Sequence, residues 1–512
     1  MSFMAKKRED RAKGKKHEQF SGDLDGGFVS PLRSIRDLSA SNIRTALAGS
    51  RYLQTLFGLT VIGAFLRLYN IGFNSLWLDE ATTYNISINT IAGIWQTMVS
   101  GEFNPPLFYW IEHVMLMFGN NETILRLVPA VAGILTIPLV YLVASEFLDR
   151  NLGIISAAAF TFSPFLLYYS QEARAYSLMM FFVAFAMVFY LKAMKSGNLH
   201  EWALFGVLSA LAFWAHFYAL VIIGALILYA LAIQLIDLKK NLASVKMILA
   251  GIAVFVVLSL PLIIVTIQLF ARRTAGGPTF GSQGLELIYQ TFLQFAGSLD
   301  IVMYILVILF IAGIIQAFLI DRNKGIFLAT LTILTFLISF VLSYKIPMVP
   351  RYLIFFDIVF VIGIAFTYKA AIALFNSKTI IYGFLIFFFV ISLPGLASYY
   401  SGFTKDDWRG FALGMHQEAK PGDYIVLVPG YISQPFDYYY TNSSAGTFEF
   451  LATNSTELNA INSIKANNSV YFIVTGDIYS ADPSGNALQW LKENTRAVGS
   501  DTGIALFVST TH

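Results

Sequence analysis

Long apolar blocks recur along the chain, separated by short polar stretches. Six of them carry few charged residues: 52–69, 123–147, 301–320, 325–343, 352–374 and 380–396. A helix needs about 20 residues to cross the roughly 30 Å of hydrocarbon in a bilayer, so each block is long enough for about one crossing. The pattern predicts a polytopic α-helical membrane protein.

The stretch between the first two blocks, residues 70–122, contains two shorter apolar segments. These are 86–98 and 107–118, and the second carries Glu112 and His113. Segments of this length more often lie on the membrane surface than cross it. We therefore expect an external loop with juxtamembrane helices.

The distribution of basic residues supports this topology. If 107–118 does not cross the membrane, nearly every lysine between the later crossings falls on one side, which the positive-inside rule identifies as cytoplasmic. The residues on this side are Arg150, Lys192, Lys195, Lys239, Lys240, Lys246, Arg322, Lys324, Lys369 and Lys378. The prediction is about eleven transmembrane helices, with the N-terminus cytoplasmic and the C-terminus outside.

Both ends of the chain are polar. We interpret residues 1–51, with a basic run at 6–16, as a cytoplasmic tail that fixes the orientation; binding of anionic lipid or nucleic acid is the alternative. No apolar segment with a small-residue cleavage site precedes the first block, so no cleaved signal peptide is expected. The apolar blocks place a transmembrane domain at 52–400.

Residues 401–512 contain no further block that could cross a bilayer. The pattern predicts an extracytoplasmic α/β domain with strands at 424–428 and 470–474 and helices at 406–419, 456–466 and 487–493. Three N-x-[ST] triplets, at Asn442, Asn454 and Asn467, agree with an outside location.

Composition restricts the class further. Of the 512 residues, 56% are hydrophobic and 13% are charged, whereas soluble domains carry about a quarter charged residues. The chain has no cysteine, which excludes disulfides, thiolate catalysis, Cys-ligated zinc and iron–sulfur clusters. The net charge of +3 is too small to indicate a partner, and we expect none that is a nucleic acid.

Candidate chemistry lies at the predicted outer face, and its clearest motif is Ser-Leu-Trp-Leu-Asp-Glu-Ala at 75–81. Asp79 or Glu80 could act as a general base at the membrane surface, or hold a divalent metal. The alternative is that both merely favour the dipole at the start of a helix over 81–90.

A second motif, at 168–176, lies between two apolar blocks and contains Gln171, Glu172, Arg174 and Tyr176. Arg174 could clamp a phosphate or organise the acidic motif, or it could form an ion pair with Glu172 that anchors a helix end.

A third motif, at 345–352, has two prolines that keep the connection extended between the cations Lys345 and Arg351. Two fixed positive charges beside hydrocarbon would suit a lipid phosphate, and interfacial anchoring is the alternative.

Weaker candidates are scattered over the same face. His216 could be a metal ligand or proton carrier, although a structural role is the alternative. Arg272 and Arg273 precede a stretch, 274–284, that could close over a substrate or be a plain flexible loop.

Together these motifs resemble the GT-C superfamily of membrane glycosyltransferases, and most closely the branch with protein O-mannosyltransferases and the lipid A aminoarabinose transferase. The matching pieces are Trp-Leu-Asp-Glu-Ala at 77–81, Asn-Pro-Pro-Leu-Phe-Tyr at 104–109, Leu-Arg-Leu-Val-Pro at 125–129 and the run at 163–176. The resemblance covers roughly 52–351, and Lys-Asp-Asp-Trp-Arg at 405–409 opens an appended domain seen in many relatives.

The resemblance implies a transferase that moves a hexose or pentose from a polyprenyl-phosphate donor to a protein, lipid or glycan at the outer membrane face. Asp79 would be the base, and Glu80 would assist it or bind a metal. Arg126, Arg174 and Arg351 would face the donor phosphate or hold the acidic loop. The family often has His where this chain has Asn104, so no cofactor is certain; a divalent metal, at Glu80 or His216, remains open.

A single displacement by the activated acceptor would invert the anomeric carbon. The main alternative is a multi-pass transporter or flippase for lipid-linked sugars, which predicts symmetric halves and broken helices near mid-membrane. A receptor or scaffold is a further alternative. In contrast to what a transporter predicts, the charged residues gather at one face and the sequence shows no half-to-half repeat. A receptor or scaffold would leave the clustered charges unexplained, so the pattern favours the transferase.

Overall fold

The computed structural model describes residues 47–102, 104–236, 238–440, 445–463 and 468–509. The chain divides into two compact units, Met1–Gly58 and Leu59–His512. Most of the predicted basic tail, and the triplets at Asn442 and Asn467, lie outside the described residues. The predicted boundaries at residues 51 and 400 remain predictions.

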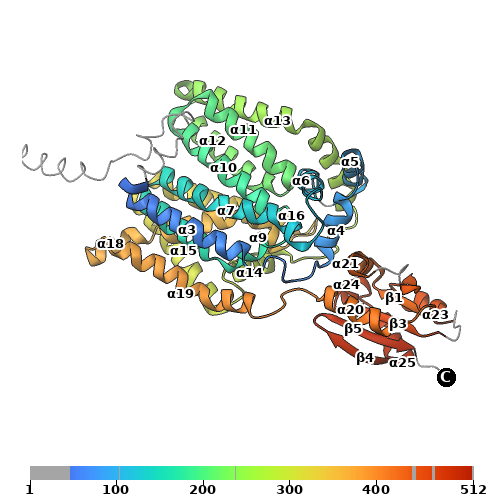
Figure 1. Cartoon of the computed structure of the whole chain (residues 1–512). Helices are drawn as coiled ribbons and strands as arrows, with labels where there is room; N and C mark the ends of the chain where they lie inside the picture. Colours follow the sequence, from blue (N-terminus) through green and yellow to red (C-terminus); the bar gives the residue numbers. More distant parts are fainter. Residues whose placement is uncertain (1–46, 103, 237, 441–444, 464–467, 510–512) are drawn as a thin grey trace, which may run out of the picture. The chain divides into compact units, whose positions relative to one another are not determined.

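Apolar helices long enough to cross a membrane dominate the second unit (Figure 1). Seven of the described stretches qualify: α7 (Glu122–Phe147), α10 (Tyr176–Ser196), α13 (Leu238–Thr274), α15 (Asp300–Ile320), α16 (Arg322–Ser343), α17 (Phe356–Ala365) with α18 (Tyr368–Phe375), and α19 (Ile380–Tyr400). An eighth is formed if α8 (Arg150–Phe162) and α9 (Pro164–Ser170), bent by 63°, make one crossing. The chain is therefore a multi-pass membrane protein.

The predicted number of crossings is larger than this set. Eleven are reached only if α3 (Arg51–Leu68), α11 (Leu199–Ala215) and α12 (Ala219–Leu235) also cross. Eleven therefore remains a prediction.

The outer helices leave apolar faces without a protein partner. On α15, Ile301, Ile308 and Leu319 are all exposed. Exposed apolar stripes of this length are unfavourable in water, and lipid chains would cover them.

The first loop forms three short helices, α4 (Leu78–Ser87), α5 (Ile91–Ser100) and α6 (Leu107–Met115). They confirm that the shorter apolar segments are too short to cross a bilayer. The helix expected from residue 81 begins at Leu78 instead, so Asp79 and Glu80 lie in its first turn. Trp95, Trp110 and Trp214 stack with ring centroids 5.7–6.5 Å apart and join α5 and α6 to the end of α11.

A second connection follows α13. The predicted loop at 274–284 touches the 345–351 segment, where Ser282 N donates to Met348 O at 2.9 Å. Gly281 has a φ of 94°, and a Cβ there would lie 2.2 Å from the Met348 carbonyl oxygen, so this close approach requires glycine. The helix α14 (Gly284–Phe295) follows, and it was not predicted.

The C-terminal part forms a mixed five-stranded sheet in the order β2-β1-β3-β5-β4. The strands are β1 (Tyr424–Val428), β2 (Phe448–Leu451), β3 (Val470–Thr475), β4 (Thr495–Asp501) and β5 (Ile504–Ser509). β1 runs parallel to β2 and β3, whereas β5 is antiparallel to β3 and β4. The predicted strands β1 and β3 are confirmed, and they are the two central parallel strands.

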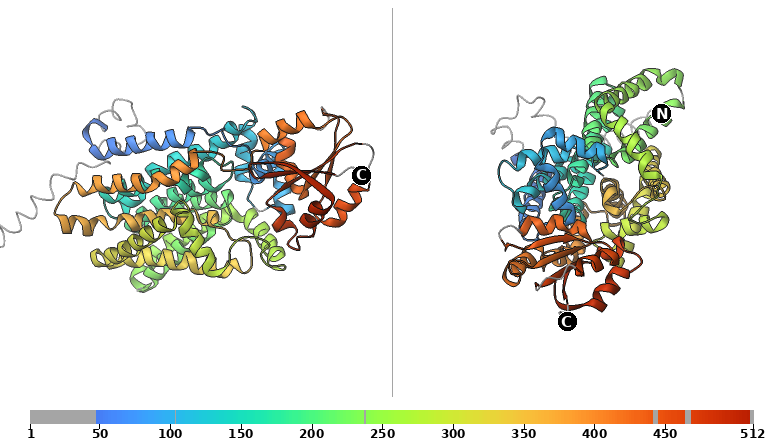
Figure 2. Two further views of the ribbon diagram at one scale, coloured as in Figure 1. Left: turned by 90° about the horizontal axis from the view of Figure 1, so that it is seen from below. Right: turned by 90° about the vertical axis from the view of Figure 1, so that its right-hand side faces the viewer.

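Alternate residues of β1 and β3 supply two separate cores, because successive side chains point to opposite faces of a sheet. Ile425 and Leu427 pack with α20 (Trp408–Glu418) and α21 (Ser433–Tyr439) on one face. Val426 and Val428 pack with α23 (Ser455–Asn462) and α25 (Asn486–Asn494) on the other. Helices lie on both sides of the strands (Figure 2). The result is a three-layer α/β/α domain. Asn454 caps α23 in a capping box with Glu457.

Candidate active site

Three segments that are distant in the sequence meet at the start of α4. They are the acidic motif itself, the turn 171–175 between α9 and α10, and the 3₁₀ turn η2 (Pro350–Leu353). This turn begins at the second proline of the connection that was expected to be extended, so that expectation is wrong for Pro350 and Arg351. Gln171 fixes the turn to the end of α3, because its Nε2 donates to the carbonyls of Leu66, Arg67 and Tyr69 at 2.8–3.2 Å. The three predicted motifs therefore come together.

Glu80 is held by a two-point ion pair with Arg126. Arg126 Nε and Nη2 donate to the two carboxylate oxygens at 2.7 and 2.6 Å, and both side chains are buried. The same guanidinium donates to the carbonyls of Ile71, Asn74 and Ser75 at 2.8–3.0 Å. Of the two roles expected for Arg126, this geometry corresponds to holding the acidic loop.

The environment of Glu80 favours its charged form. Burial alone would raise the pKa of this carboxyl, but the charges of Arg126 and Lys405 outweigh burial and lower the pKa to about 2. Glu80 therefore stays ionised at neutral pH.

Asp79 has a different environment, because its side chain is 24% exposed whereas those of Glu80 and Glu172 are completely buried. Its Oδ2 lies 3.5 Å from Arg351 Nη2 and 3.9 Å from Arg174 Nε. Arg174 also donates to the Asp79 carbonyl at 3.1 Å. Two arginines thus share one accessible carboxylate, which leaves positive charge for an anionic ligand.

Aromatic rings hold Arg351 in place. Its Nε donates to the Tyr176 hydroxyl at 3.0 Å, and its guanidinium lies 5.8 Å from the Trp77 ring and 5.7 Å from the Tyr352 ring. Such packing fixes an arginine without neutralising its charge.

Lys405 belongs to the same cluster, although no motif predicted it as a site residue. Its Nζ lies 3.0 Å from Glu80 Oε2 and 3.8 Å from Glu172 Oε2, and its side chain is 3% exposed. Burial raises the pKa of Glu172 to about 7, against the opposing charge of Lys405. The one sequence signal for Lys405 is a cation on the side from which the insertion bias depletes basic residues.

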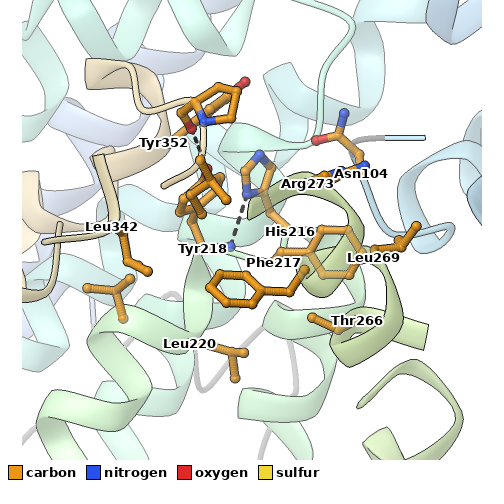
Figure 3. Close-up of a pocket in the computed structure, with 14 residues that line it drawn as sticks. Asn104, His216, Phe217, Tyr218, Leu220, Thr266, Leu269, Arg273, Leu342 and Tyr352 are labelled. Carbon is orange, nitrogen blue, oxygen red and sulfur yellow. Dashed lines mark hydrogen bonds between the residues drawn. The ribbon is translucent and has the colours of Figure 1, made fainter. Parts of the chain in front are cut away.

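A cavity of about 170 Å³ has the His216 and Tyr352 side chains in its lining (Figure 3). Asn104, His216, Arg273 and Tyr352 line its polar part, and residues such as Leu220, Leu269, Phe270 and Leu342 line the remainder. The His216 ring lies 5.4 Å from both the Tyr176 and Tyr352 rings, which links the cavity to Arg351.

His216 is a neutral imidazole in this setting. Burial, together with the charges of Arg174 and Arg351, lowers its pKa to about 3. Its Nδ1 accepts from Tyr218 N at 3.4 Å, while Nε2 has no hydrogen-bond partner among the described residues. The ring can therefore offer one polar atom to a ligand.

Of the remaining predicted site residues, Arg273 and Asn104 line the cavity, whereas His113, Lys345 and Arg272 do not. Arg273 Nη2 donates to the carbonyls of Gly101 and Glu102 at 2.9 and 2.6 Å, and Asn104 Nδ2 donates to Glu102 Oε1 at 3.3 Å. His113 Nδ1 lies 2.8 Å from Ser87 O, which joins α6 to α4. Lys345 and Arg272 are exposed and have no ion pair in the described part of the chain.

The residues present do not fit a divalent metal at Glu80. Its Oε1 accepts from Arg126 and Ala173, and its Oε2 faces Arg126 and Lys405. No group of three or more His, Cys, Asp or Glu side chains that could hold a metal ion occurs within the described ranges. His216, the other metal candidate, is surrounded by tyrosine rings.

One stretch of the chain matches a known protein family. Residues 104–264 match the family described as dolichyl-phosphate-mannose-protein mannosyltransferase. No curated protein matches the chain by sequence.

Solved structures align over most of the chain. AglB from Archaeoglobus fulgidus, an archaeal oligosaccharyltransferase in complex with an inhibitory peptide and a dolichol-phosphate, has 14% identity and a TM-score of 0.53, with 91% of this chain and 75% of that chain covered. ArnT from Cupriavidus metallidurans has 14% identity and a TM-score of 0.52 in the apo state, with 90% and 98% covered. ArnT bound to undecaprenyl phosphate has 13% identity and a TM-score of 0.53, with 88% and 97% covered.

The chain has the fold of the GT-C superfamily of membrane glycosyltransferases, and the resemblance inferred from its motifs is confirmed at the level of the fold.

Proposed function

We propose that the chain is a glycosyltransferase that moves a sugar from a polyprenyl-phosphate donor to an acceptor at the extracytoplasmic face of the membrane. One observation carries the proposal: an accessible carboxylate, Asp79, faces two arginines, and one of them, Arg351, packs on Tyr352 in the lining of a cavity with a polar and an apolar part. This combination suits a lipid-linked anion whose head reacts while its tail stays among helices.

The cavity is the proposed donor site. Arg273 lines the cavity and would attract the donor phosphate, while Leu220 and Leu269 would contact the first part of the lipid tail (Figure 3). Arg351, which packs on the Tyr352 ring of the lining, would add a second positive charge. The complex of ArnT with undecaprenyl phosphate, which has the same fold, supports this class of donor.

Asp79 is the proposed base. It would take the proton of the acceptor hydroxyl as the oxygen attacks the anomeric carbon, a contribution of about 10²–10⁴-fold for a positioned base. The bond to the polyprenyl phosphate breaks in the same step, and the leaving phosphate gains negative charge. Fixed cations near its oxygens stabilise that charge in the transition state. One displacement inverts the anomeric carbon.

The orientation follows from the charge distribution. Lysines and arginines between crossings would face the cytoplasm with the N-terminus, so the acidic loop and the sheet domain would lie outside. The acceptor is a protein, lipid or glycan hydroxyl that reaches Asp79 from that side.

Transfer in liposomes tests the proposal. The purified protein is reconstituted with radiolabelled polyprenyl-phosphate sugars and membrane extract as acceptor, and wild type is compared with Asp79→Asn. We expect label transfer by the wild type and a loss of about 10²–10⁴-fold in the variant. Asp501→Asn, which removes an exposed carboxylate on β4, is the matched control and should transfer normally.

Two results would count against the proposal. A wild-type protein that transfers label from none of the donors would leave a fold without this activity and would favour a flippase. An Asp79→Asn variant that still transfers sugar would show that another residue is the general base.

A further inference from the structure

The segment that leaves α19 for the sheet domain passes directly beside the acidic loop. Thr404 N donates to Asn74 Oδ1 at 2.9 Å, and Ser75 Oγ donates to Asp407 Oδ1 at 2.8 Å. Arg409 pairs with Glu122 at 2.8 Å at the start of α7. Residues 404–409 are therefore fixed on both sides of Lys405.

Lys405 places an ammonium group between two buried carboxylates, Glu80 and Glu172. Its Nζ also lies 5.4 Å from the centroid of the Tyr168 ring. Removing an ammonium from water is costly unless it is paired, so a lysine this deeply buried depends on both carboxylates.

The two carboxylates do not depend on Lys405 equally. Glu80 already has the two-point pair with Arg126. Lys405 is the one cation within ion-pair distance of Glu172 in the described part of the chain, and neither oxygen of Glu172 accepts a hydrogen bond there. The pairing of Glu172 therefore comes from the C-terminal segment.

Glu172 lies in the turn that carries Arg174. Ala173 N donates to Glu80 Oε1 at 2.8 Å, and Arg174 reaches both the carboxylate and the carbonyl of Asp79. A shift of this turn would move Arg174 away from the proposed base.

We propose that Lys405 is a positioning residue for the transfer reaction: its ammonium group, held between Glu172 and Glu80, fixes the 171–175 turn that sets Arg174 against Asp79. The inference rests on the proposed function. It makes the beginning of the C-terminal domain part of the active-site architecture, although Lys405 itself does not touch substrate.

A double-mutant cycle on kcat tests the inference. Lys405→Met, Glu172→Gln and the double variant are assayed with a polyprenyl-phosphate donor, next to Lys492→Met, an exposed lysine of α25, as the matched control. Displacement of a positioning group costs about 10- to 100-fold, so Lys405→Met should lower kcat by that factor with little change in the donor KM. The double variant should be about as active as Lys405→Met, because the Lys405–Glu172 link is already broken in either single variant.

The opposite results would overturn the inference. These are a wild-type kcat in Lys405→Met, or a double variant whose loss is the product of the two single losses. If Lys405→Met does not fold, Glu172→Gln alone decides: the same fall in kcat at unchanged KM supports the inference, and a wild-type kcat overturns it.

The thermal unfolding midpoints of the wild type, the two single variants and the double variant separate this inference from the proposed function. Non-additive midpoint shifts would show that Lys405 and Glu172 are linked even if no donor is used. A protein that transfers no sugar but shows this coupling would contradict the proposed function, whereas a protein that transfers sugar without coupling would contradict the role of Lys405.

Discussion

Two adjacent carboxylates, Asp79 and Glu80, differ completely in their surroundings because they begin a helix. Successive side chains of a helix point about 100° apart, so the two cannot face the same partner. Glu80 faces the buried Arg126, whereas Asp79 faces Arg351 and solvent. The two neighbours therefore differ in role: Glu80 is a buried partner of Arg126, and Asp79 is an accessible carboxylate.

Glu80→Gln should destabilise the protein. Breaking a buried ion pair by removing one partner costs about 3–5 kcal/mol, because the remaining guanidinium is uncompensated. The loss can be measured as a lowered thermal midpoint, with the exposed Glu493→Gln as control. An unchanged midpoint would mean that Arg126 finds another partner.

The same carboxylate predicts an acid transition. The pKa of Glu80 is lowered from 4.5 to about 2, so its stabilisation is fully present above about pH 4.5 and is lost as the pH falls towards 2. The wild type should lose stability over this range, and Glu80→Gln should lose less. Equal acid sensitivity of the two proteins would contradict the assignment.

At the scale of elements, the sequence predicts what depends on local patterns. The apolar blocks correspond to α15, α16 and α19 because hydropathy within one segment decides membrane insertion. The helix α14 could not be predicted in this way, since it is short and follows a glycine-containing loop. Lys405 could not be predicted either, because its partner Glu80 is more than 300 residues away in the sequence. Each of the three motifs, at 75–81, 168–176 and 345–352, is recognisable in the sequence by itself. Their contact in space depends on how the helices pack, which local patterns do not predict.

The end of α13 gives a matched pair of neighbours. Arg273 lines the cavity and donates to two loop carbonyls, whereas Arg272 is exposed. Hydrogen bonds to charged groups contribute about 1.5–3 kcal/mol, so Arg273→Gln should raise the donor KM about 10- to 100-fold. Arg272→Gln should have little effect. Equal donor KM values for the two variants would contradict the proposed contact between Arg273 and the donor phosphate.

At the scale of the whole second unit, the sheet domain and the membrane helices share the acidic loop. Tyr439 of α21 accepts from Leu76 N at 2.8 Å and donates to Glu122 at 2.6 Å. This contact requires the loop and the sheet domain to lie on the same side of the membrane. An experiment that places the sheet domain on one side of the membrane therefore also places the acidic loop there.

Single cysteines in this cysteine-free chain can test the orientation. Lys492→Cys in α25 should react with a membrane-impermeant maleimide on intact cells, whereas Lys378→Cys, between α18 and α19, should react only after permeabilisation. The reverse pattern would place the acidic loop in the cytoplasm.

The most direct test of the account is the anomeric configuration of the transferred sugar. The reconstituted wild type is given a polyprenyl-phosphate sugar of known anomer, and the product is examined by NMR. A single displacement by an acceptor oxygen activated by Asp79 predicts the opposite anomer in the product. A retained configuration would require a covalent intermediate and would contradict the mechanism, and the absence of any glycosylated product would contradict the activity itself.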